Sequence, residues 1–301
     1  MSVVASRSVA GRFLLGRGGS ALFGRGGRWL ALLLVVAWSL FPLYWGLSTS
    51  LMSTSDADST PIRYYPHPLF WSNYGQLLGL QHSTLGTLGS QLRRALLNST
   101  IECLGTTVLT VFVAIFAAYA FARLEFRFKR PILVITIATL LLPAYATLLP
   151  LYKLMTSWNL VNTYMGVILT NTSGFLPLAI WVLYNYFQGL PKELEEAAFI
   201  DGARPLGALF RIILPLSLPG IAAAAAITFL FSWAQFLFPL ILTTDLQSEP
   251  ATVVIAALYG PRLVAFSVMA AAGMVAIAIP GLLSLLLNRY VVSGLTAGAT
   301  K

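Results

Sequence analysis

Long apolar stretches separated by short polar segments dominate the chain from residue 29 onward. The hydrocarbon core of a bilayer is about 30 Å thick, so a spanning helix needs roughly 20 consecutive apolar residues. Alternation of apolar and polar residues, which a membrane β-strand requires, is missing from these stretches. The pattern predicts an all-α protein with six transmembrane helices, at residues 29–51, 98–122, 131–153, 164–188, 212–242 and 264–288.

The composition supports this prediction, because hydrophobic residues make up 57% of the 301 residues and charged residues only 10%. A soluble domain carries about 25% charged residues. The first apolar run has no charged residue between Trp29 and Ser55. It is longer than the roughly 7–15-residue core of a signal peptide, which favours a retained span. Because Cys103 is the only cysteine and both histidines lack acidic neighbours at ligand spacing, no disulfide and no metal site are expected.

The net charge of +9 would suggest a nucleic-acid partner in a soluble protein, but its distribution favours another explanation. Fourteen of the 19 Lys and Arg residues lie in the N-terminal tail, the C-terminal tail and the connections after the second and fourth spans. The positive-inside rule then predicts that both termini are cytoplasmic. We expect a disordered basic extension at 1–28 beside membrane lipid, a membrane domain at 29–290 and a cytoplasmic tail at 291–301, with no nucleic acid bound.

The connection after the fourth predicted span, residues 190–215, is polar and unusually structured for a membrane loop. Pro191 and the acids that follow it favour a first helix, since carboxylates stabilise the positive end of a helix dipole. Asp201-Gly202 favours a turn, and Arg204-Pro205 favours a second helix. A helix lying on lipid headgroups usually has a basic polar face. Residues 192–201 carry one Lys and four acids, so their polar face would be repelled by anionic lipid headgroups. This favours binding of the segment in a cleft of another protein.

The spacing Glu-Ala-Ala, three residues, Gly, nine residues, Ile-x-Leu-Pro resembles the signature of inner-membrane permeases of ATP-binding-cassette (ABC) importers. The chain is similar to the carbohydrate-uptake, maltose-type (MalG-like) branch in residues 118–124, in 294–299 and at Asn73-Tyr74. The resemblance implies a type I ABC importer permease fold. It covers nearly all of residues 29–301. The signature is met by Glu196, Ala197, Ala198, Gly202, Ile212, Leu214 and Pro215.

This resemblance implies that the polar segment binds in a cleft of a cytoplasmic ATPase subunit and couples ATP-driven closure to rocking of the spans. It further implies a second homologous permease subunit, two ATPase subunits, an extracytoplasmic solute-binding protein and a sugar or sugar derivative as substrate, of the oligosaccharide, disaccharide or sugar-phosphate class. The tail near Gly298 would add a second ATPase contact. The residues expected to couple to the ATPase are Glu196, Ala197, Ala198, Asp201, Gly202, Leu214 and Pro215.

The chain lacks the Gly, four residues, Gly-Lys-Ser/Thr pattern that cradles nucleotide phosphates. We therefore expect no catalytic residue and no cofactor on this chain, with ATP and magnesium bound by the partner ATPase.

Two rival functions remain. An ion-coupled secondary transporter usually carries several ionisable groups at mid-membrane, and a membrane enzyme needs clustered His, Asp or Glu; the predicted spans supply neither.

Polar and helix-breaking residues inside spans tend to face a bundle interior or a water-filled cavity. Such residues either line a translocation pathway or bond between helices, and the sequence leaves both open. Related sugar permeases commonly have Trp-Asn-acid-aromatic where this chain has Trp233-Ala234-Gln235-Phe236, so this chain lacks the charge that they carry in the fifth span. Glu102 is expected to reach the headgroup interface. The candidate pathway residues are Tyr145, Asn171, Thr172, Ser173, Trp233 and Gln235.

Overall fold

The computed structural model describes residues 25–81, 87–258 and 266–296, and within these ranges the regular structure is entirely helical. Most of the predicted basic extension and the end of the C-terminal tail, including Gly298, lie outside the described residues.

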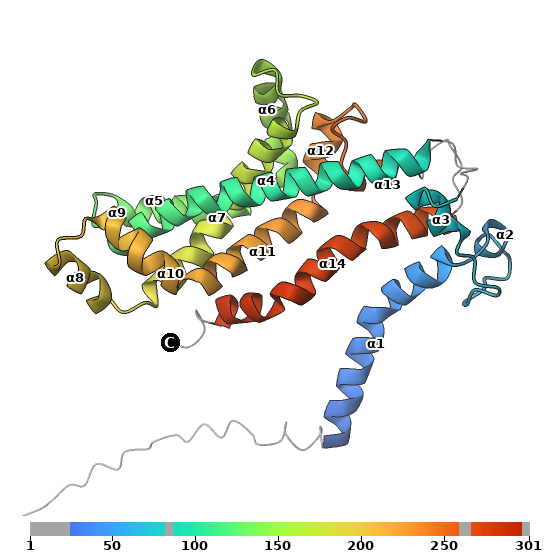
Figure 1. Ribbon diagram of the computed structural model, residues 1–301, viewed down its shortest axis with the longest axis horizontal. Coiled ribbons are helices and arrows are strands. Elements are labelled where there is room, and N and C mark those ends of the chain that lie inside the picture. The colour runs from blue at the N-terminus through green and yellow to red at the C-terminus, as the bar shows by residue number, and fades with distance from the viewer. Residues whose placement is uncertain (1–24, 82–86, 259–265, 297–301) are drawn as a thin grey trace, which may run out of the picture.

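Four of the helices are each long and apolar enough to cross a membrane (Figure 1). They are α1 (Arg25–Ser50), α4 (Leu88–Arg123), α7 (Tyr164–Gln188) and α14 (Phe266–Thr296). If each of two bent helix pairs is one further span, the described residues contain six spans, as the sequence predicts.

The first bent pair is α5 (Lys129–Ala138) with η1 (Thr139–Leu141), followed by α6 (Ala144–Ser157) at 101°. The second is α9 (Pro205–Ala208), η2 (Leu209–Ile213) and α10 (Leu214–Leu216), followed by α11 (Leu218–Ala234) at 78°. Shorter helices complete the described chain: α2 (Thr54–Ala57), α3 (Ser72–Leu78), α8 (Glu193–Ile200), α12 (Leu237–Leu242) and α13 (Ala251–Ala257).

Two of the six predicted spans are interrupted in the structure, although each was predicted as one transmembrane helix. In the stretch 131–153, the backbone turns extended at Leu142 (φ −69°, ψ 127°), directly before Pro143. Proline disfavours the helical conformation of the residue before it. In the stretch 212–242, the helix stops at Gln235, which is also extended (φ −67°, ψ 127°). The second predicted span is correct in place but too short, since α4 begins at Leu88.

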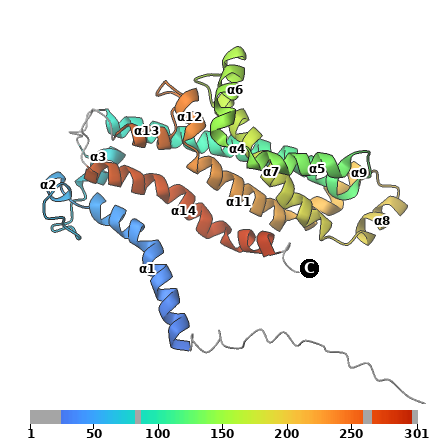
Figure 2. The same ribbon diagram turned by 180° about the vertical axis from the view of Figure 1, so that it is seen from behind.

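The core of the molecule lies where α4, α7 and α11 run side by side, as both views show (Figures 1 and 2). Small residues let the backbones approach closely, and Ala114 and Ala118 of α4 are fully buried with Leu183 and Phe187 of α7. By contrast, α1 packs only on α14 among its larger contacts and exposes apolar side chains along its length. Most of the surface of α1 is therefore uncovered by the other described helices.

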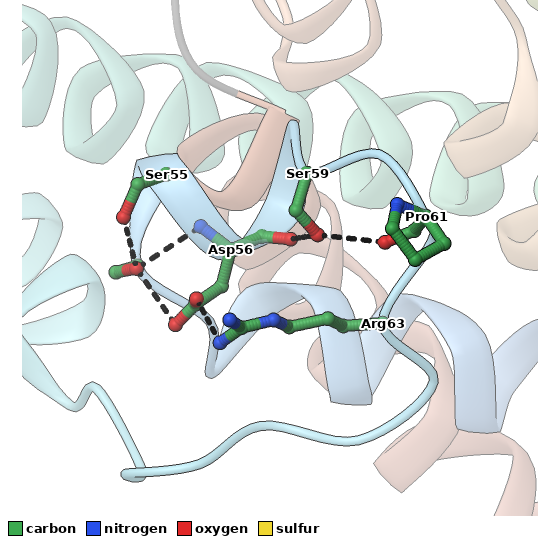
Figure 3. A network of polar contacts seen from close by, with 6 residues as sticks. Ser55, Asp56, Ser59, Pro61 and Arg63 are labelled. Carbon is green, nitrogen blue, oxygen red and sulfur yellow. Dashed lines mark hydrogen bonds and ion pairs between the residues drawn. The ribbon is translucent and has the colours of Figure 1, made fainter.

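The connection from α1 to α3 forms a compact polar loop (Figure 3). The guanidinium of Arg63 pairs with the carboxylate of Asp56, and Ser53 Oγ donates to the same carboxylate over 2.9 Å. Asn73 Nδ2 donates to the carbonyls of Ser50 and Met52, at 2.9 and 3.0 Å, and so holds the end of α1 against α3. These contacts give this end of the bundle a fixed shape.

Gly166 in the first turn of α7 lies where no side chain fits. A Cβ there would be 2.2 Å from the backbone carbonyl oxygen of Leu160, whereas a Cβ at Gly174 of the same helix would meet nothing within 4 Å. Gly166→Ala should therefore lower the free energy of unfolding by about 1–3 kcal/mol, the usual cost of overpacking. The control Gly174→Ala should be neutral or stabilising, because alanine favours helix. Thermal unfolding in detergent measures both, and equal stability of the two variants would contradict the packing described.

Candidate coupling site

The polar segment forms a helical hairpin, defined here as residues 193–216, that projects from one end of the bundle (Figures 1 and 2). As predicted, Asp201-Gly202 makes the turn, and the positive φ of Gly202 (82°) is one that glycine adopts without strain. Pro205 stands in the first turn of α9, also as predicted. Pro191 was expected to be the first residue of the first helix, but α8 begins two residues later, at Glu193.

One face of the hairpin is open to its surroundings and combines acidic with apolar side chains. Glu196, Ala197 and Asp201 are exposed, and Ile200 at the tip is 86% exposed. A cavity of about 360 Å³ lies between the two arms of the hairpin, with Ala197 on one side and Arg211 on the other. Exposed apolar residues next to a hollow are typical of an interaction surface.

The opposite face of the hairpin packs inward. Ala198 is buried, Leu214 is half-buried against the core cluster, and Leu209 and Ile213 are fully buried. Pro215 is exposed. The predicted coupling residues therefore divide into an outward group, which can meet a partner, and an inward group, which fixes the hairpin on the bundle.

Glu195 is the central contact of the hairpin, and the sequence reasoning did not single it out. Its side chain is buried, and its Oε1 accepts a hydrogen bond from the hydroxyl of Tyr119 on α4. Its Oε2 lies 3.1 Å from Nε of Arg123, one helical turn further along α4. That contact is ionic, because Arg123 Nε makes no directed hydrogen bond there. Tyr119, Arg123 and Glu195 are called the Glu195 cluster below.

The Glu195 cluster also holds two neighbouring segments by their backbones. Arg123 Nη2 donates to the carbonyl of Leu190, just after α7, over 2.9 Å. The hydroxyl of Tyr119 also lies 3.1 Å from the carbonyl of Pro205, the first residue of α9. Two side chains of α4 therefore connect α7, α8 and α9 at one point.

A sequence signal for this cluster exists but is weak. Tyr119 and Arg123 are four residues apart, which places them on one face of a helix. Their contact with Glu195 could not be predicted, because Glu193, Glu195 and Glu196 are alike in sequence and only the pitch of α8 decides which one points inward.

A second cavity, of about 470 Å³, lies beside the break between α5 and α6. Among the candidate pathway residues, Ser173 and Gln235 line it, next to Gly174, Phe175 and Phe238. The side-chain oxygen of Gln235 accepts hydrogen bonds from the backbone amides of Phe236, at 3.0 Å, and of Leu237, the first residue of α12, at 3.2 Å. Polar groups, aromatic rings and a helix break thus meet at one hollow.

The other candidate pathway residues lie elsewhere. Asn171 Nδ2 is 3.5 Å from Ser232 Oγ and Thr172 Oγ1 is 3.4 Å from Thr110 Oγ1, both between helices. Trp233 is buried and stacks on Phe229, with a ring-centroid separation of 5.8 Å. Tyr145 is exposed on α6. The structure therefore brings two of the six candidates to the same cavity and leaves four outside its lining.

The expectation for Glu102 is wrong. We expected its side chain to reach the headgroup interface, but the residue is 2% exposed and packed within the bundle. The reason is the length of α4, which begins at Leu88 and therefore places Glu102 well inside the helix. In the described part of the chain, no group of three or more His, Cys, Asp or Glu side chains could hold a metal ion.

Comparisons with known proteins agree with this architecture. The family described as "Binding-protein-dependent transport system inner membrane component" matches residues 110–296, a range that includes the hairpin and the cavity. In the structural comparison, the chain is similar to a subunit of a bacterial ABC transporter involved in the import of the acidic polysaccharide alginate. The TM-score is 0.71 at 20% identity, over 89% of this chain and 98% of that one, which supports the type I importer permease fold.

Three relatives align over most of their length. The sulfoquinovosyl glycerol transport system permease protein SmoH of Agrobacterium fabrum is 34% identical over 91% of this chain and 93% of its own. The trehalose transport system permease protein SugB of Mycobacterium tuberculosis is 35% identical over 89% and 94%. The trehalose/maltose transport system permease protein MalG of Thermococcus litoralis is 34% identical over 87% and 91%. This chain therefore belongs to the family of binding-protein-dependent transport system inner membrane components, and it is a multi-pass membrane permease.

Proposed function

We propose that this chain is one permease subunit of an ATP-driven importer for a sugar or sugar derivative, and that its hairpin binds the ATPase. The observation that carries the proposal is the two-sided hairpin. Its inward face is fixed to the bundle by the buried Glu195 cluster, while Glu196, Ala197 and Ile200 stay exposed. A hairpin that is fixed rigidly to the bundle and exposes acidic and apolar side chains can bind a partner and move together with it.

The substrate class is supported by the relatives, whose names specify sulfoquinovosyl glycerol, trehalose and maltose. The cavity beside the α5–α6 break has chemistry that suits such solutes. Ser173 and Gln235 can bond to hydroxyl groups, and the rings of Phe175 and Phe238 offer flat apolar faces. We place the solute pathway of this subunit along that cavity.

The partners follow from what this chain lacks. It has no phosphate-binding loop, so ATP and magnesium would be bound by two separate ATPase subunits and this chain would have no catalytic activity of its own. A second, homologous permease would complete the pathway and cover exposed apolar helix faces such as that of α1. An extracytoplasmic solute-binding protein would deliver the sugar.

The distribution of positive charge supports a cytoplasmic location for the hairpin and both termini. In a Cys103→Ser background, the cysteine of Ile200→Cys should react with a membrane-impermeant maleimide only after the cells are permeabilised. A cysteine at Tyr65, which is also highly exposed in the loop after α1, should react in intact cells. Labelling at Ile200 in intact cells would invert the topology and remove the ATPase from the proposal.

Glu196 tests the proposed ATPase surface. Glu196→Lys reverses an exposed charge whose side chain forms no hydrogen bond or ion pair with the described residues, so the permease should fold and insert normally. We expect loss of ATPase co-purification and at least a tenfold loss of ATP-dependent solute uptake in vesicles, since like charges placed in an interface oppose binding.

The matched control is Glu125→Lys, the same charge reversal at an exposed residue that lies in the connection before α5, outside the hairpin. Its surface ion pair with Lys129 contributes little to stability, so uptake and ATPase association should stay close to those of the parent. Full uptake in Glu196→Lys, or equal losses in both variants, would contradict the assignment of the hairpin.

Gly174 tests the proposed pathway. Gly174→Leu places a side chain where nothing lies within 4 Å and fills part of the cavity. Uptake should fall several-fold while the ATPase still co-purifies, because the substitution lies in the middle of α7 and leaves every hairpin residue unchanged. The control Gly273→Leu, at an equally open glycine of α14 outside that cavity, should keep its uptake. Normal uptake in Gly174→Leu would show that the solute passes elsewhere.

A further inference from the structure

Two separate parts of α4 carry buried polar side chains that hold other segments of the chain. At the inner end, the Glu195 cluster holds the hairpin. About three turns after the start of α4, Asn98 and Ser99 hold the connection between α12 and α13, residues 243–250, which we name the outer segment. From Ser99 to Tyr119 the helix rises about 30 Å, at 1.5 Å per residue. The two sites of attachment are therefore separated by about the thickness of a bilayer core.

The outer attachment is as well defined as the inner one. Asn98 is 1% exposed, and its Nδ2 donates to the carbonyl of Glu249 over 2.9 Å. Ser99 Oγ accepts a hydrogen bond of 2.8 Å from the backbone amide of Ala251, which begins α13. Tyr164, the first residue of α7, donates to Asn98 Oδ1 over 2.8 Å and lies 3.1 Å from the carbonyl of Gln247.

Between these attachments, α4 is stiff. It runs without a proline for 36 residues. Of the other two helices of the core, α7 is continuous but contains Pro177, which removes one backbone hydrogen bond, and the span of α11 is bent by 78° at its start. Long side-by-side packing against α7 braces α4 further (Figures 1 and 2). Of the elements that connect the two ends, α4 is the one that can transmit a displacement with the least bending.

We infer that α4 is the rigid connection that carries a displacement of the hairpin to the outer segment, with Tyr119, Arg123 and Glu195 as positioning residues at one end and Asn98 and Ser99 at the other. This inference rests on the proposed function, in which the ATPase moves the hairpin. It adds that the motion of the hairpin reaches the outer segment through side-chain contacts with α4. The helices that flank the hairpin in sequence, α7 and α11, are then not the only route. Coupling between two sites is reciprocal in binding free energy.

The experiment uses the complete complex in lipid nanodiscs, with Cys103 replaced by Ser and one environment-sensitive fluorophore on a single introduced cysteine. One sample carries the label at Leu246 in the outer segment, and a second carries it at Ile200 at the hairpin tip; both side chains are exposed. The probe added is the non-hydrolysable ATP analogue AMP-PNP with magnesium. In the parent, both labels should respond.

Breaking either attachment should separate the two responses. With Glu195→Gln, or with the milder Tyr119→Phe, the Leu246 response should fall by about fivefold or more, while the Ile200 response and ATPase co-purification persist. Asn98→Ala, or the milder Ser99→Ala, should have the same effect from the other end. A merely structural role would not move the Leu246 response alone.

Two control variants complete the design. Thr100→Ala lies next to Ser99, but its hydroxyl bonds only to the carbonyl of Leu96 in its own helix. Arg127→Gln removes a cation near the inner end that stacks on Phe128 and lies outside the Glu195 cluster. Both should keep the full Leu246 response.

An undiminished Leu246 response in the attachment variants would overturn the inference. So would loss of the Ile200 response together with the Leu246 response in all four variants, because the residues would then serve only to fold the hairpin. Absence of any Ile200 response in the parent is a different failure, which would count against the proposed function itself.

Discussion

The architecture depends on one buried carboxylate. Glu195 is removed from solvent between a hydroxyl and a guanidinium of α4. A buried charge is tolerated only when it is paired and hydrogen-bonded, and removing one partner of such a pair typically costs about 3–5 kcal/mol. The pairing therefore fixes where α8 lies. Because Arg123 also donates to the carbonyl of Leu190, and the Tyr119 hydroxyl lies 3.1 Å from the carbonyl of Pro205, the cluster fixes the end of α7 and the start of α9 as well.

The fixed position of α8 explains how the hairpin can both pack on the bundle and present a surface to a partner. The same helical pitch that turns Glu195 and Ala198 inward turns Glu196 and Ala197 outward. The turn at Gly202 then folds the second arm back and leaves a small cavity between the arms. In the proposed function, the ATPase would meet a rigid surface, so that its motion would pass to the bundle and would not be absorbed by the loop. The broken spans near the second cavity supply the complementary feature, because irregular backbone at membrane depth is tolerated where it lines a hollow.

Much of the fold could be predicted from the sequence because bilayer thickness restricts the length of apolar runs. The boundaries of α7 were predicted to the residue, and the hairpin was predicted from Asp201-Gly202 and Pro205. The breaks at Leu142 and Gln235 could not be placed, since prolines also occur inside intact helices here, such as Pro177 in α7. The family follows from the Glu196 signature together with its relatives.

The candidate site was predicted less completely than the fold. The sequence identified the outward residue Glu196 but not the inward Glu195, because a difference of one residue on a helix is decided by tertiary packing. Among the pathway candidates, the polar residues Asn171 and Thr172 bond between helices, while Ser173 beside them lines the cavity. Residue type does not distinguish these roles; the direction of the side chain does.

The most direct test of the account is a pair of cryo-electron microscopy structures of the whole complex, one without nucleotide and one with ATP trapped in a hydrolysis-deficient ATPase. The account predicts that the hairpin occupies a cleft of the ATPase in both structures, and that the contacts of Glu195 with Tyr119 and Arg123 persist while α4 and the hairpin move together. A hairpin that shifts relative to α4, with these contacts broken in either state, would contradict it.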